Sequence, residues 1–137
     1  MANFEVIYVG ELRCNAKHLD SGIEILTDAP KDNHGKGESF SPTDLLATSL
    51  GTCMITVMGI EARSLKIDIS GTILSISKTM GTLPRRVVEI GIELKIPDRN
   101  FTEQEKNKLM DTGLNCPVAK SLHPNLKQNI QFQFIKM

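Results

Sequence analysis

Three cysteines carry most of the chemical potential of this chain, and Cys116 stands in the most suggestive setting. It directly precedes Pro117, and residues 118–122 continue in a helical pattern. Because proline prefers the first position of a helix, Cys116 lies at or just before a helix N-terminus. The unpaired N–H groups and the dipole of such a terminus favour a thiolate. Cys116 is therefore either a reactive thiol or a cysteine that only accepts a backbone hydrogen bond at the cap.

The other two cysteines have settings that are easier to explain by packing. Cys53 lies in the middle of an uncharged segment, residues 45–60, where a buried cysteine often only fills space. Cys14 follows Arg13 in a segment with strand alternation, which places the two side chains on opposite faces. We expect a packing role for Cys14. An odd count of cysteines without a signal-peptide pattern indicates reduced thiols and a cytoplasmic protein.

Several other kinds of site are not predicted. His18, His34 and His123 are scattered, without the paired spacing of a zinc site, so no metal is expected. Gly35 and Gly37 lack the spacing and the Gly-Lys-Ser ending of a phosphate loop, and no cofactor is expected. Lys and Arg total 16, as do Asp and Glu, so the net charge of zero argues against a nucleic-acid-binding surface.

The elements around these residues predict one α+β domain over residues 1–137, in the order ββ–α–ββ–α–α–β. Turn residues and period-two alternation indicate two hairpins and a closing strand. Helix-capping residues mark three helix starts. The expected strands lie within residues 3–17, 22–29, 67–78, 85–96 and 130–134, and the helices start near Ser41, Thr102 and Cys116, the second of them ending at Gly113.

The helix that carries Cys53 has consequences for assembly. Ser41 suits the N-cap, Pro42 the first helical position, and Asp44 the reciprocal capping contact. The uncharged stretch from Leu45 to Ile60 falls short of the ~20 residues that cross a bilayer and is rich in Thr and Ser, so no membrane is expected. A helix buried on nearly all sides needs cover from more than one sheet, which points to association with a second copy.

Two segments match a known family. Residues 40–54, Phe-Ser-Pro-Thr-Asp-Leu-Leu-Ala-Thr-Ser-Leu-Gly-Thr-Cys-Met, resemble the signature that leads into the central helix of the OsmC/Ohr family. Residues 115–122, Asn-Cys-Pro-Val-Ala-Lys-Ser-Leu, resemble the second signature of that family. Both motifs occur in the family's order and separation, and the hairpins fit as well. The resemblance therefore covers nearly the whole chain.

The resemblance implies an intertwined homodimer with antiparallel sheets wrapped around central helices. It implies that Cys53 is the peroxidatic cysteine, which attacks an organic hydroperoxide, and that Cys116 is the resolving cysteine. A dithiol reductant then restores both thiols. An arginine from the N-terminal strands stabilises the thiolate in typical members, and Arg13 lies in the matching region. Substrate would lie along an apolar wall whose candidate residues are Leu46, Leu50, Met54 and Met58.

One departure from the family pattern leaves an alternative open. The well-characterised peroxidase branches have a glutamate ten residues before the peroxidatic cysteine, where it holds the arginine; this chain has Thr43. Threonine offers one neutral hydrogen bond, so we predict a looser arginine or one supplied from elsewhere. The alternative is a non-catalytic stress protein that binds a small apolar or thiol ligand at the dimer interface. The same four apolar residues fit that alternative, or a dimer core with no ligand.

Overall fold

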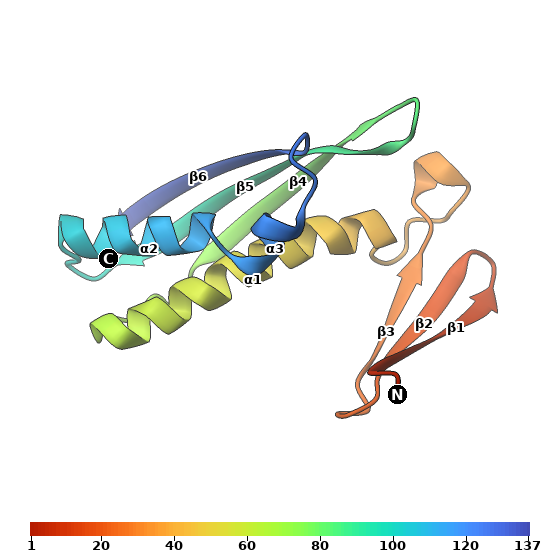
Figure 1. Cartoon of the computed structure of the whole chain (residues 1–137), viewed down its shortest axis with the longest axis horizontal. Coiled ribbons are helices and arrows are strands. Elements are labelled where there is room, and N and C mark those ends of the chain that lie inside the picture. Colours follow the sequence, from red (N-terminus) through yellow and green to blue (C-terminus); the bar gives the residue numbers. More distant parts are fainter. The chain divides into compact units, whose positions relative to one another are not determined.

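The computed structural model describes residues 1–137 and divides them into two compact units, Met1–Leu46 and Ala47–Met137. The elements, drawn in Figure 1, are β1 (Phe4–Gly10), β2 (Arg13–His18), β3 (Glu24–Asp28), the 3₁₀ helix η1 (Lys31–Asn33), α1 (Pro42–Leu65), β4 (Ile73–Gly81), β5 (Arg86–Asp98), α2 (Glu103–Leu114), α3 (Pro117–Ser121) and β6 (Lys127–Lys136). The predicted α+β class is confirmed.

The N-terminal unit contains an antiparallel sheet in the order β1-β2-β3. We predicted a single strand over residues 3–17, and this is wrong, because the segment folds into a hairpin. Its turn places Gly10, Glu11 and Leu12 at φ values of 89°, 55° and 63°. Non-glycine residues rarely adopt this region, so Glu11 and Leu12 give no sequence signal for the turn.

The start of α1 matches the predicted cap. Ser41 Oγ accepts from the Asp44 N–H at 3.1 Å, and Asp44 Oδ2 accepts from the Ser41 N–H at 2.9 Å. These reciprocal bonds satisfy N–H groups that the first helical turn leaves unpaired. The helix continues beyond the uncharged stretch and ends at Leu65, so its total length is 24 residues.

By length and composition alone, α1 could cross a membrane, with a mean hydropathy of 1.5 over an 18-residue window. Core helices of soluble proteins pass the same test. In this chain one stripe of α1 is buried in a protein core, formed by Ala47, Leu50, Gly51, Met54, Met58 and Ala62. These positions recur every three or four residues, as expected for one face of a helix.

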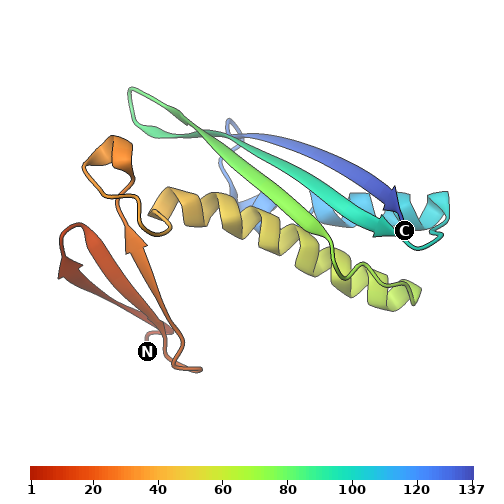
Figure 2. The same ribbon diagram turned by 180° about the vertical axis from the view of Figure 1, so that it is seen from behind.

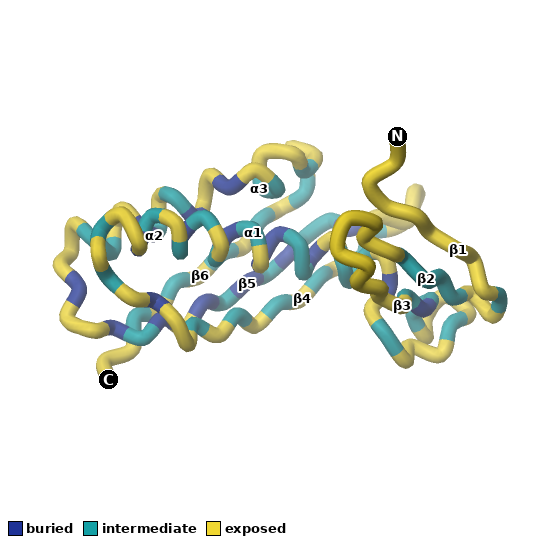
Figure 3. The backbone as a smooth tube through the Cα atoms, turned by 90° about the horizontal axis from the view of Figure 1, so that it is seen from below, coloured by how far each residue is buried: buried dark blue, intermediate teal, exposed yellow.

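The C-terminal unit is a sheet in the order β4-β5-β6 with helices on one face (Figures 1 and 2). Buried residues alternate with less buried ones along most of β5 (Figure 3). Ile90, Leu94 and Ile96 are fully buried in the hydrophobic core. β4 and β5 are antiparallel, whereas β6 pairs with β5 in parallel. The expectation of purely antiparallel sheets is therefore wrong for one pair, because the chain crosses over through α2 and α3 before it forms β6.

The second helix begins as predicted and ends differently. Thr102 and Glu105 form a capping box at the start of α2. Gly113 does not end the helix; it is buried in the last turn, and α2 continues to Leu114. A Cβ atom at Gly113 would lie 2.7 Å from Met58 Sδ. The glycine therefore permits a close approach of α2 to α1, which is a packing role and not a helix stop.

Candidate active site: two thiols at the start of α3

The two predicted redox cysteines lie together in the C-terminal unit. Cys53 is a half-buried residue of α1, and Cys116 is the N-cap of α3 with 1% of its surface exposed. The Val118 N–H donates to Cys53 Sγ at 3.5 Å, and the Ala119 N–H donates to Cys116 Sγ at 3.4 Å. Both sulfur atoms therefore accept from neighbouring amides of one helical turn.

Several contacts hold this short helix in place. Pro117 occupies its first position, where a missing N–H costs no hydrogen bond. The Ser121 hydroxyl donates to the Pro117 carbonyl at 2.8 Å. From β6, Gln128 Nε2 donates to the Ala119 carbonyl at 3.1 Å, which ties α3 to the sheet. The position of Cys116 is therefore determined by α3 and β6, and that of Cys53 by α1.

Burial and neighbouring groups perturb the Cys116 thiol. Burial raises the pKa of the Cys116 thiol above its ordinary value of 9.0. The N–H of Ala119 lowers that pKa, but the hydrogen bond and the charge interaction with Cys53 raise it further. Cys116 therefore stays protonated at neutral pH and can donate its S–H to the Cys53 sulfur.

We expect iodoacetamide to modify Cys53 before Cys116 at pH 7 to 8. The thiolate is the reactive form, and Cys116 is both buried and kept protonated. Mass spectrometry of peptides taken over a time course measures the order. The unfolded chain is the control, because its three thiols should react at similar rates. Faster labelling of Cys116 than of Cys53 in the folded protein would contradict the inference that Cys116 is shielded and protonated.

The same shift makes the free energy of unfolding depend on pH. Above the ordinary thiol pKa of 9.0, the unfolded chain loses the Cys116 proton while the folded chain retains it. The contribution of this group to stability is therefore complete below that value and declines as the pH rises above it.

The four residues predicted as an apolar wall do not share one environment. Leu50, Met54 and Met58 have at most 1% of their surface exposed and belong to the core between α1 and the sheet. Leu46, at 37% exposed, is the last residue of the N-terminal unit. The three buried side chains support α1 beneath Cys53, and a role of any of the four in substrate binding stays a prediction.

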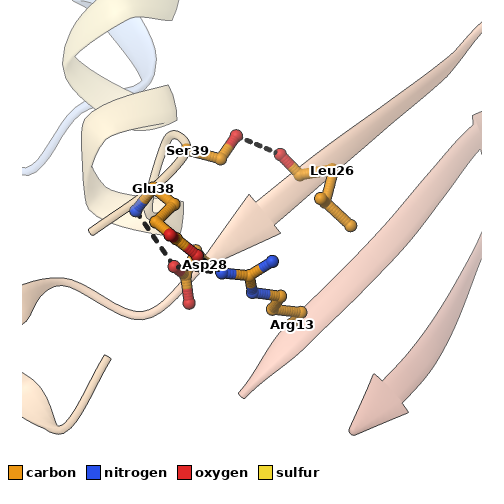
Figure 4. Close-up of polar contacts among 5 residues, drawn as sticks. All are labelled: Arg13, Leu26, Asp28, Glu38 and Ser39. Atoms are coloured by element: carbon orange, nitrogen blue, oxygen red, sulfur yellow. Dashed lines mark hydrogen bonds and ion pairs between the residues drawn. The ribbon is translucent and has the colours of Figure 1, made fainter. Parts of the chain in front are cut away.

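Arg13 has two acidic partners within the N-terminal unit (Figure 4). Its Nη2 lies 3.4 Å from Asp28 Oδ2 and also contacts Glu38 Oε1. Arg13 and Asp28 are direct cross-strand partners of β2 and β3, so their side chains lie on the same face of the sheet. The expected hairpin through residues 20–22 is confirmed by the pairing of β2 with β3, but the sequence did not predict the register that places Arg13 opposite Asp28.

Comparison with known proteins accounts for these features. The sequence profile of OsmC-like proteins matches residues 35–131, which include both Cys53 and Cys116. The chain belongs to the OsmC-like family. The resemblance to the OsmC/Ohr family is therefore confirmed.

Solved structures of OsmC-like proteins share this fold. A Psychrobacter arcticus protein, described as an osmotic stress induced and detoxification response protein, is 48% identical, with a TM-score of 0.91 over 96% of each chain. An OsmC-like protein from Mycoplasma pneumoniae is 17% identical, with a TM-score of 0.76 over 100% of this chain and 97% of the other. An organic hydroperoxide resistance protein from Elizabethkingia anophelis is 17% identical, with a TM-score of 0.75 over 98% of each chain. The last two show the fold alone. Comparison with curated proteins finds no match.

In this OsmC-like protein, Thr43 is part of a helix cap. Its hydroxyl lies 3.2 Å from Ser41 Oγ, at the start of α1. From Thr43 we predicted an arginine that is looser or supplied from elsewhere, and this stays a prediction. Arg13 itself has two acidic partners, Asp28 and Glu38, neither of which is residue 43. Sequence reasoning missed these two acids. The only available signal was that Glu38 lies two residues before the first family motif.

Cys14, His18 and His123 make contacts within the N-terminal sheet or within turns. Cys14 pairs with Tyr8 and Thr27 across the N-terminal sheet. His18 Nδ1 lies 2.7 Å from Ser21 Oγ at a turn, and His123 Nδ1 accepts from the Asn125 N–H at 3.0 Å. These contacts agree with the packing role that we expected for Cys14 and with ordinary turn roles for the two histidines.

Proposed function

We propose that this OsmC-like protein is a thiol peroxidase that reduces organic hydroperoxides through Cys53 and Cys116. The observation that carries the proposal is that both sulfur atoms accept from amides of the same turn of α3. The two thiols are also hydrogen-bonded to each other. Relatives of the same fold from Legionella pneumophila and Elizabethkingia anophelis bear the name organic hydroperoxide resistance protein, which agrees with this chemistry.

In the first step, the Cys53 thiolate attacks the terminal oxygen of the hydroperoxide. A sulfur–oxygen bond forms as the O–O bond breaks, and the bonding pair leaves on the alkoxide, which takes a proton to become an alcohol. Cys53 is then a sulfenic acid. The charge on the leaving oxygen is best stabilised by a nearby cation. We propose Arg13 for this role.

In the second step, the Cys116 sulfur attacks the sulfenic sulfur and water leaves, forming a disulfide. Cys116 must lose its proton in this step, and the departing hydroxide accepts it. A dithiol reductant, oxidised in turn to its own disulfide, returns both cysteines to thiols. The raised pKa of Cys116 suits this order, because it keeps the second thiol protonated and unreactive until the sulfenic acid forms.

A thiol titration tests this function against ligand binding. We expect one equivalent of cumene hydroperoxide to remove two thiols per chain, and a dithiol to restore them. The matched control is one equivalent of cumyl alcohol, which has the same shape but no O–O bond. Unchanged thiols after hydroperoxide treatment would replace the peroxidase with a protein that only binds an apolar ligand.

We also propose that the protein works as a homodimer in the cytoplasm, each chain forming one OsmC-like domain. The family profile spans the boundary between the two units, which supports a single domain. Apolar side chains on one face of the β1-β2-β3 sheet support association. Phe4, Val6 and Tyr8 lie on that face and are each more than 60% exposed. Ile60 on α1 is equally exposed. A soluble monomer rarely leaves such patches uncovered.

Light scattering is expected to give a mass of about twice 15.1 kDa at micromolar concentration. The physical reason is that a second copy covers the apolar sheet face and the exposed side of α1. Val6→Lys should weaken the dimer. Lys127→Ala, at the first residue of β6, is the control and should leave the dimer unchanged. A stable monomer of the parent protein would contradict the proposal.

A further inference from the structure

The helix α3 (Pro117–Ser121) has only five residues, and its N-cap is Cys116. A helix this short is not stable by its own hydrogen bonds, because forming the first turn costs more conformational entropy than one hydrogen bond returns. The position of Cys116 therefore depends on the contacts that α3 makes with other elements of the C-terminal unit.

Apolar packing and a hydrogen bond join α3 to those elements. Val118, Ala119 and Leu122 are partly buried against the hydrophobic core. Such packing is non-directional, so it does not by itself fix the orientation of the helix. The Ala119 carbonyl, in contrast, accepts from Gln128 Nε2 of β6 at 3.1 Å. This directed contact joins the middle of α3 to the sheet.

The contact with Gln128 differs from the contact with Cys53 in what the reaction does to it. While both cysteines are free thiols, the Val118 N–H donates to Cys53 Sγ at 3.5 Å. The proposed first step adds an oxygen atom to that sulfur, and the second step brings the two sulfur atoms to about 2.05 Å. The sulfur contact is therefore altered at each step, whereas the amide of Gln128 takes no part in the chemistry.

Gln128 is also a polar exception in an apolar row. Along β6 it lies on the same face as Ile130, Phe132 and Phe134, which pack against the core. Gln128 is half-buried, so its amide loses part of its hydration and needs a hydrogen-bond partner, which the Ala119 carbonyl provides. An apolar side chain would suit this face for packing alone. The glutamine is therefore better explained by its contact with α3.

The placement of Cys116 matters most in the second step. There the Cys116 sulfur bonds to the Cys53 sulfur as the sulfur–oxygen bond breaks, and the departing hydroxide takes the Cys116 proton to become water. A displacement of about 1 Å from the productive geometry can slow such a step by about 100-fold. The first step involves Cys53 and the hydroperoxide, and α1 determines the position of Cys53.

We infer that Gln128 is the positioning residue of Cys116 and that it acts through the Ala119 carbonyl on the second step alone. The inference rests on the proposed function. It adds the group that keeps the second thiol in line with the sulfenic acid. A substitution that touches neither cysteine is then expected to separate the two steps.

Two substitutions in the full-length protein remove the hydrogen bond in different ways. Gln128→Leu has a similar volume and suits the apolar row, so the variant should fold. Gln128→Glu keeps the shape, but its carboxylate has no donor for the Ala119 carbonyl. Gln131→Leu and Gln131→Glu are the matched controls, because Gln131 lies on the exposed face of the same strand.

The experiment measures the two steps separately. Single-turnover consumption of cumene hydroperoxide measures the first. With dimedone present during the reaction, the ratio of trapped to disulfide-bridged chains measures the second, because trapping competes with disulfide formation. For Gln128→Leu we expect a first step within about two-fold of the parent and a ratio about 10-fold higher, as for the loss of one buried hydrogen bond. A purely structural role would lower stability without raising this ratio.

A ratio in Gln128→Leu equal to that of the parent overturns the positioning role, and normal consumption of the hydroperoxide then leaves the peroxidase intact. A first step slowed as much as the second also overturns it, as does the same rise of the ratio in the Gln131 controls. If Gln128→Glu fails to fold, Gln128→Leu alone decides. A parent that does not consume the hydroperoxide overturns the proposed function and this inference together.

Discussion

Substitution of Cys53 by serine is expected to abolish the reaction with organic hydroperoxides. The loss should be on the order of 10⁶-fold, as for removal of a catalytic nucleophile, which leaves only the uncatalysed background. A serine hydroxyl is far less nucleophilic than a thiolate at neutral pH. It can still accept from the Val118 N–H, so the start of α3 should be little disturbed. Single-turnover consumption of cumene hydroperoxide measures the loss.

Cys14→Ser is the matched control for this prediction. Cys14 belongs to the N-terminal sheet and contacts Tyr8 and Thr27 across it, so its thiol has no part in the proposed steps. We expect the rate of this variant to equal that of the parent. A Cys53→Ser protein that retains the parent rate would show that another group is the nucleophile.

Substitution of Cys116 by serine is expected to separate the two steps. Cys53 keeps the Val118 N–H, and a serine hydroxyl can still donate to its sulfur, so the first oxidation should stay within a few-fold of the parent. The resolving thiol is gone, so the product should be a sulfenic acid and not a disulfide. Turnover with a dithiol should therefore fall sharply.

Intact-mass analysis after one equivalent of hydroperoxide gives the readout. The Cys116→Ser chain should gain about 16 Da for one oxygen and react with dimedone, a sulfenic-acid probe. The parent, treated in the same way, should not react with dimedone once its disulfide has formed. A variant that still loses two thiols per chain would contradict the resolving role of Cys116.

Local capping chemistry made part of the fold predictable. Ser41, Pro42 and Asp44 predict the start of α1, and Thr102 with Glu105 predicts that of α2, because these contacts join residues within one turn. The proline after Cys116 predicts α3 for the same reason. Contacts between residues that are close in the sequence can be predicted from the sequence alone.

Features that depend on distant partners left no such pattern. Gly113 is buried because α2 passes close to Met58, a contact between two helices that the sequence does not mark. The turn at Glu11 and Leu12 uses residues with no turn preference. Asp28 and Glu38 meet at Arg13 only because β2 pairs with β3 in one particular register. The cysteine pair was recognised from its motifs, whereas the acids around Arg13 required the structure.

Peptide mapping of the oxidised protein tests the central claim most directly. The parent is treated with one equivalent of cumene hydroperoxide, digested without reduction, and analysed by mass spectrometry. The account predicts one main bridge, between Cys53 and Cys116, with Cys14 still a thiol, because the first two sulfur atoms share the opening turn of α3. A main bridge that includes Cys14, or the absence of any bridge, would contradict it.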